Sequence, residues 1–122
     1  NKPIMRAKCL LIIFMIVCFS CRNGVTILLE NKSDDVIDSV LIHTGFNKIK
    51  LEKITKNELH EFFVDFRNIK HGKDGVFYLS VFDNGEIKNS QQFGYYSFGI
   101  PPSHDFNIII ETDTILIKHI AN

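Results

Sequence analysis

The chain has 122 residues, of which 45% are hydrophobic, and this provides for a single domain with a packed core. Its 14 basic and 14 acidic residues are unevenly placed. Lys2, Arg6 and Lys8 give the segment before Cys21 a charge of +3, whereas the rest of the chain has 11 basic and 14 acidic residues and a charge of −3. Because affinity for nucleic acid comes mainly from Lys and Arg on phosphates, we expect no nucleic-acid partner for the acidic part.

The cysteines are confined to the start of the chain, at Cys9, Cys18 and Cys21. No residue after Cys21 can therefore form a disulfide or a thiolate metal site. The remainder includes nine phenylalanines, and we expect it to be held together by hydrophobic packing.

The first 21 residues have the three-part layout of a secretory signal. Met5, the expected initiator, precedes a short basic region with Arg6 and Lys8. Residues 9–19 are an apolar run, which is shorter than the roughly 20 residues that a membrane-spanning helix needs. Ser20 and Cys21 end the segment.

This segment resembles the signal peptide of bacterial lipoproteins, in the relaxed form found in Bacteroidota. Ser20 matches the small residue before the cut, and Cys21 matches the acceptor of the lipid. Phe19 and Cys18 depart from the pattern, which usually has Ala or Gly and Leu there. The resemblance implies that Cys21 is lipidated and that the chain is anchored to a membrane of the cell envelope, at the outer membrane or its periplasmic face. An ordinary cleaved signal and a buried helix are the alternatives.

After an expected tether at residues 22–24, residues 25–122 show the alternation typical of half-buried strands. Strands are expected at 25–30, 36–43, 47–53 and 76–83. Asp83, Asn84 and Gly85 predict a hairpin turn into a returning strand at 86–98, because Asn and Gly tolerate positive φ. A proline-containing loop at 99–105 and strands at 106–111 and 114–120, joined around Thr112 and Asp113, complete the domain.

The segment 55–66 can be interpreted in two ways. Thr55 and Glu58 match a helix capping box, and several apolar residues recur at helical spacing. Phe62, Val64 and Phe66 instead alternate with polar residues, and aromatic and β-branched residues favour strands. We predict a strand.

Seven or eight short strands predict an all-β fold, a small antiparallel two-sheet sandwich of immunoglobulin-like or transthyretin-like type. The expected interior comprises the apolar phase of these strands: Val25, Ile27, Leu29, Ile49, Leu51, Phe62, Val64, Phe66, Phe77, Leu79, Val81 and Ile108.

No residue pattern indicates catalysis, a metal or a cofactor, and we expect a protein that is not an enzyme. The five histidines are not paired at i, i+2 or i, i+4. Asp34, Asp35 and Asp38 lack the spacing of an EF-hand and are best interpreted as an acidic turn. Ser103, His104 and Asp105 are adjacent, whereas catalytic triads converge from distant segments.

One aromatic stretch, at residues 93–99, is a candidate binding surface, with Tyr95, Tyr96 and Phe98 as its possible binding residues. Alternation places Phe93 and Tyr95 on one face and Tyr96 and Phe98 on the other. The leading functional hypothesis is a non-enzymatic envelope lipoprotein whose sandwich binds a protein partner or serves as an accessory module. A glycan-binding module and a periplasmic immunity or inhibitor protein are the alternatives.

Overall fold

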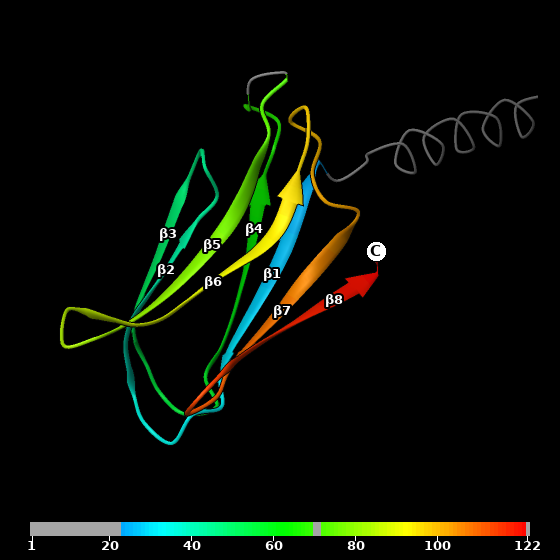
Figure 1. Ribbon diagram of the computed structural model, residues 1–122. Helices are drawn as coiled ribbons and strands as arrows, with labels where there is room; N and C mark the ends of the chain where they lie inside the picture. Colours follow the sequence, from blue (N-terminus) through cyan, green and yellow to red (C-terminus); the bar gives the residue numbers. More distant parts are fainter. Residues whose placement is uncertain (1–22, 70–71, 122) are drawn as a thin grey trace, which may run out of the picture.

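The computed structural model describes residues 23–69 and 72–121, so the signal segment and Cys21 lie outside the described residues. Eight strands make up most of this part of the chain (Figure 1). They are β1 Gly24–Asn31, β2 Ile37–His43, β3 Lys48–Ile54, β4 Leu59–Asp65, β5 Gly75–Asp83, β6 Glu86–Tyr96, β7 His104–Ile110 and β8 Ile115–Ala121. The all-β class is confirmed.

The strands form two four-stranded sheets, with the orders β4-β1-β7-β8 and β3-β2-β5-β6, and the two-sheet sandwich is confirmed. Every strand pair is antiparallel except β1 with β7, which is parallel and departs from the antiparallel expectation. In immunoglobulin domains the first two strands share one sheet. Here β1 and β2 lie in different sheets, so the strand order differs from that of an immunoglobulin domain.

The ambiguous segment at 55–66 contains β4, and the prediction of a strand is correct. Thr55 and Glu58 form one of the two hydrogen bonds of a capping box, that to the Glu58 side chain, in the turn before the strand. The Thr55 N–H donates to Glu58 Oε2 at 3.1 Å, and the Glu58 N–H donates to the Thr55 carbonyl at 3.1 Å. The motif therefore closes a tight connection between β3 and β4.

The core lies between the sheets, and all of the residues expected there contact it. Ile49, Leu51 and Phe62 are only partly buried, because β3 and β4 are edge strands. The sequence analysis missed several core residues on the other strands, among them Val40, Ile42, Phe93, Tyr96 and Phe106.

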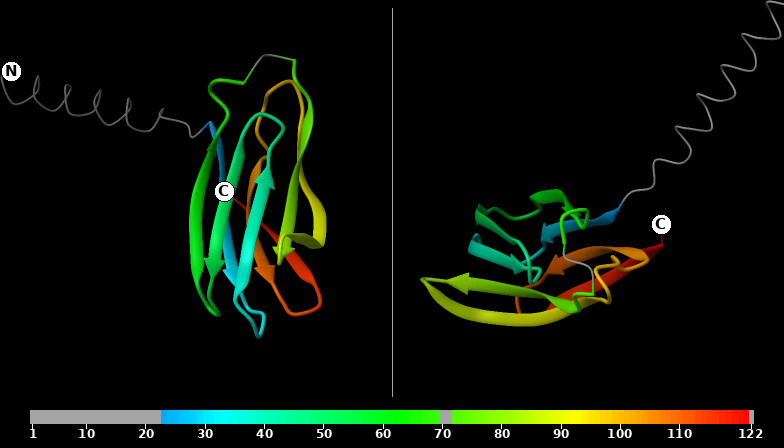
Figure 2. Two further views of the ribbon diagram at one scale, coloured as in Figure 1. Left: turned by 90° about the vertical axis from the view of Figure 1, so that its left-hand side faces the viewer. Right: turned by 90° about the horizontal axis from the view of Figure 1, so that it is seen from above.

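The turns between strands gather at two opposite ends of the sandwich (Figure 2). We call the end where β1 begins the N-terminal end; it carries the connections at 44–47, 66–74 and 97–103. The other end, which we call the acidic end, carries the connections at 32–36, 55–58, 84–85 and 111–114. Across residues 23–69 and 72–121, no helix has the length and hydrophobicity to cross a membrane.

Candidate functional site

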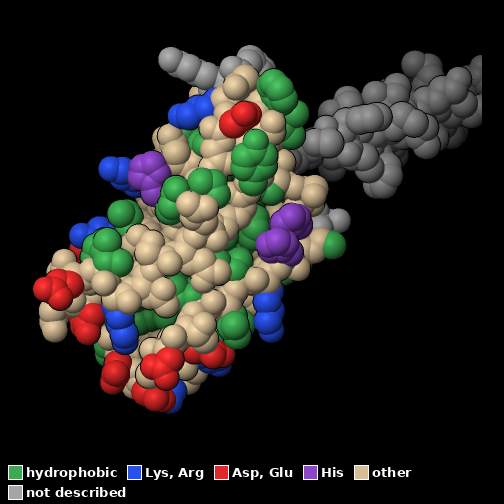
Figure 3. Space-filling model, viewed as in Figure 1, with side chains coloured by type: hydrophobic (Ala, Val, Ile, Leu, Met, Phe, Trp, Pro, Cys, Tyr) green, Lys and Arg blue, Asp and Glu red, His purple; other side chains and the backbone are tan. Residues whose placement is uncertain are grey.

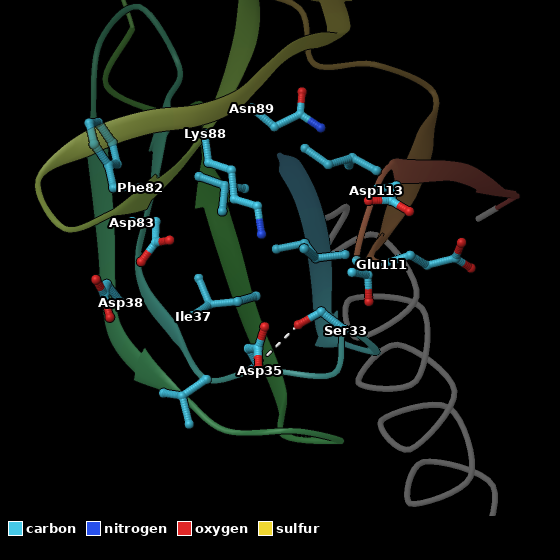
Figure 4. Close-up of a pocket in the computed structure, with 15 residues that line it drawn as sticks. Ser33, Asp35, Ile37, Asp38, Phe82, Asp83, Lys88, Asn89, Glu111 and Asp113 are labelled. Carbon is cyan, nitrogen blue, oxygen red and sulfur yellow. Dashed lines mark hydrogen bonds between the residues drawn. The ribbon is translucent and has the colours of Figure 1, made fainter.

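A pocket of about 390 Å³ opens at the acidic end, between β2 and β5–β6 of one sheet and the β7–β8 turn of the other (Figure 4). It is deep enough to be lined by core residues: Ile37, Val81, Ile110 and Ile115 form its floor. A concave site with an apolar floor and polar groups around it is the usual form of a ligand site.

Acidic residues outnumber basic ones in the lining of this pocket. It contains five acidic residues and a single lysine, Lys88: the acids are Asp35, Asp38, Asp83, Glu111 and Asp113. Figure 4 shows the Lys88 side chain entering the pocket from β6. None of the ion pairs between described residues joins Lys88 to a carboxylate, so its charge does not neutralise any of these acids by direct contact. Acidic side chains also gather at this end of the surface (Figure 3).

The loop that bears Asp35 is held by a buried asparagine. Asn31, the last residue of β1, donates from Nδ2 to the carbonyls of Asp35 (3.0 Å) and Ile54 (2.9 Å). Its Oδ1 accepts from the Ser33 N–H at 2.9 Å and from the Ser33 hydroxyl at 2.6 Å. A buried, fully bonded amide of this kind fixes a loop because breaking any of its bonds leaves an unsatisfied polar group.

A second hydrogen bond orders the opposite wall of the pocket. Asp38 Oδ2 accepts the N–H of Asn84 at 2.7 Å, which joins β2 to the β5–β6 turn. From the sequence, Asp34, Asp35 and Asp38 were expected in an acidic turn and not in a pocket. Asp35 and Asp38 line the pocket with Asp83 and Asp113, whereas Asp34 does not, and only the arrangement of the sheets brings these four residues together.

The predicted binding residues at β6 separate in the structure. The assumed alternation fails at Gly94, where Tyr95 faces Val76 and Phe93 faces Phe77, so that Gly94 is an extra, bulged residue. A Cβ on Gly94 would lie 2.8 Å from Phe106 Cζ, and the residue has φ +65°. A glycine within a strand pattern is the sequence signal of such a bulge.

Because of the bulge, Tyr96 is a core residue, and its assignment as a binding residue is wrong. Its ring is 1% exposed, and its hydroxyl donates to the Thr44 carbonyl at 2.7 Å. Burial raises the pKa of this phenol. Tyr95 and Phe98 are 65% and 67% exposed and lie at the N-terminal end, far from the acidic pocket.

Two histidines that are distant in the sequence stack on each other across β7 and β8. The rings of His104 and His119 are 4.1 Å apart between centroids and 22° from parallel, with the edge of Phe106 against both. The signal for this pair was available: a β7–β8 hairpin centred on Thr112 and Asp113 makes the two positions diagonal neighbours.

The other residues considered for metal binding or catalysis do not come together in one site. Within the described ranges no group of three or more His, Cys, Asp or Glu residues could hold a metal ion. Asp105 Oδ1 accepts the Thr26 N–H at 2.8 Å, while the His104 ring stacks on His119, so Asp105 and His104 are engaged with different neighbours. Cys21, the expected lipidation site, lies outside the described residues.

Comparison of the chain with protein-family models, with curated proteins and with solved structures finds no match.

Proposed function

We propose that this protein is a lipid-anchored, non-enzymatic binding module of the cell envelope, and that its acidic pocket binds a basic segment of a protein partner. The observation that carries the proposal is the pocket of about 390 Å³ with five acidic residues and one lysine in its lining. The signal-like segment ending at Cys21 supports the location.

The negative charge of the pocket favours a positively charged ligand. Carboxylates around a concave surface focus a negative potential, which attracts cations and speeds their association at low salt. A Lys or Arg side chain can place its apolar stem on the Ile37 and Val81 floor and its charge among the carboxylates. Because the pocket lies at the end opposite to Gly24, an anchor at Cys21 leaves it open to such a partner.

An immunity or inhibitor protein is the specific form of this function that the pocket favours over glycan binding, because an acidic surface suits a basic toxin or hydrolase. The burial of Tyr96 removes one of the three aromatic residues of the candidate binding surface and leaves Tyr95 and Phe98 for a glycan.

The test is calorimetric titration of the lipidated chain, in uncharged detergent micelles, with an oligolysine peptide. We expect weak binding that declines with added salt, since salt screens exposed charges. A variant with Asp83→Asn and Asp113→Asn should lose this binding.

The matched control carries Glu52→Gln and Glu61→Gln, which change the net charge equally but lie on β3 and β4, outside the pocket. The control should bind the peptide as the unmodified chain does. Equal loss in both variants would mean that only net charge matters, and absence of binding by the unmodified chain would reject a basic ligand.

A further inference from the structure

The large exposed hydrophobic side chains at the N-terminal end include three that belong to one short region. Tyr95 at the end of β6 and Phe98 and Ile100 in the following turn are 65%, 67% and 65% exposed. Large hydrophobic side chains are also visible at this end in Figure 3, beside the point where the chain enters the domain. Adjacent exposed apolar residues mark a contact with another apolar phase more often than scattered ones do.

The turn that presents Phe98 is rigid. The Ile100 N–H donates to the Ser97 carbonyl at 2.9 Å, and both central residues, Phe98 and Gly99, have positive φ. The Phe98 N–H donates to Asp74 Oδ1 at 2.9 Å, and the Gly99 N–H donates to the Lys73 carbonyl at 2.7 Å. These bonds fix the backbone of the turn, and the Phe98 side chain is exposed on it.

Phe98 is also an unfavourable residue for its backbone conformation. Its φ is +55°, a region that bulky L-residues adopt rarely, and local strain of this kind is concentrated at functional sites. In the β5–β6 turn the same conformation is adopted by residues that favour it, because Asn84 and Gly85 have φ values of +51° and +79°. A phenylalanine at position 98 thus lowers stability without being buried in the protein.

The length of the chain between Cys21 and the domain limits where this surface can lie. Gly24 is the first residue of β1 and is paired with Asp65, while the Asn23 carbonyl accepts the Phe66 N–H at 2.9 Å. The three residue steps from Cys21 to Gly24 span at most about 10 Å even when fully extended. A lipid on Cys21 therefore keeps Gly24, at the N-terminal end of the sandwich, within about 10 Å of the bilayer surface.

We infer that the 97–100 turn, with Phe98 and Ile100 and the neighbouring Tyr95, inserts into the interface of the membrane that holds the lipid anchor. This inference rests on the proposed lipidation of Cys21. Phe98 and Ile100 supply apolar area for the acyl boundary, and Tyr95 suits the headgroup level because its ring is apolar and its hydroxyl is polar.

The contact gives the molecule a fixed orientation. One lipid-bearing cysteine allows the domain to rotate about its tether, whereas a second contact beside it restricts that rotation. The acidic pocket, at the opposite end of the sandwich, then points away from the bilayer.

Tryptophan fluorescence tests the inference directly, because the chain contains no tryptophan. The lipidated full chain is reconstituted into vesicles of phosphatidylethanolamine and phosphatidylglycerol whose acyl chains carry bromine, which quenches tryptophan emission on contact. Phe98→Trp and Ile100→Trp each place one reporter in the turn. Ile87→Trp is the matched control, because Ile87 is 61% exposed but lies beside the turn at the acidic end.

We expect the emission of the Phe98→Trp and Ile100→Trp variants to shift to shorter wavelength and to be quenched, and that of the Ile87→Trp variant to do neither. If all three variants float with the vesicles and neither turn reporter is quenched, the inference is wrong while the anchor stands. If the chain neither carries a lipid by mass nor floats with the vesicles, both the proposed function and the inference fail.

Discussion

The two ends of the sandwich differ in the side chains that fill the space between the sheets. Toward the N-terminal end the space between the sheets is filled by aromatic rings: Phe66, Phe77 and Tyr96 contact one another, with ring centroids 5.2–6.1 Å apart, and Phe93 and Phe106 continue the cluster. At the acidic end smaller aliphatic side chains leave a pocket of about 390 Å³. Aromatic rings thus fill the space between the sheets toward the N-terminal end, whereas the pocket at the acidic end has an aliphatic floor and Phe82 as the one aromatic residue of its lining.

The largest expected effect on stability comes from truncating one buried side chain toward each end of the core. Phe77→Ala should lower the free energy of unfolding by about 3–5 kcal/mol, because it leaves a cavity within the aromatic cluster. Val81→Ala, at the floor of the pocket, should cost only about 1–2 kcal/mol, from the loss of two buried methyl groups. Ser80→Thr, on the opposite face of the same strand, should change the free energy of unfolding by less than about 0.5 kcal/mol.

Urea unfolding of the three variants measures these differences. Equal losses for Phe77→Ala and Val81→Ala would contradict the difference between the ends. Equal losses for Phe77→Ala and Ser80→Thr would contradict the assignment of the two faces of β5.

A smaller effect is expected when the polar group in the aromatic cluster is removed. Tyr96→Phe deletes the hydroxyl that donates to the buried Thr44 carbonyl, and this should cost about 1–3 kcal/mol at neutral pH. Burial raises the pKa of Tyr96, so the folded state favours the protonated phenol. The contribution of this group is therefore complete below its unfolded pKa and declines as pH rises above it, toward the folded pKa.

The Tyr96→Phe variant lacks this alkaline loss. The difference in unfolding free energy between the unmodified chain and the variant should therefore shrink above about pH 10. Denaturant unfolding of both chains at neutral and alkaline pH measures it, and a difference that grows with pH would contradict the buried, protonated phenol.

The smallest expected effect compares the two turns with positive φ at both central residues. Phe98→Asn should raise the free energy of unfolding by about 1 kcal/mol, because asparagine adopts this conformation with less strain. Asn84→Phe should lower it by a similar amount. Thermal unfolding of the two variants gives the signs, and a loss in the Phe98→Asn variant would mean that Phe98 stabilises the domain itself.

Local patterns predicted the strands well and the site poorly. Val25, Ile27 and Leu29 are fully buried as their alternation indicated, and the turn at Asn84 and Gly85 forms as its residues require. Tyr96 was misassigned because one bulged glycine shifts every later residue of β6 to the other face.

The acidic pocket could not be predicted in the same way. Its acidic residues come from the ends of two strands, β2 and β5, and from the β1–β2 and β7–β8 loops, and they converge only because the two sheets pack on each other. The sequence places these acids in separate turns and at strand ends, with no pattern that joins them. Only the arrangement of the sheets brings them to one end.

The orientation proposed for the two ends depends on the lipid anchor at Cys21. Intact-mass analysis of the protein from the membrane fraction tests that anchor most directly. We predict a chain that begins at Cys21, carries the added mass of acyl chains and is released or left uncut by Cys21→Ala. An unlipidated chain that begins elsewhere, or one that retains Met5, would contradict the account.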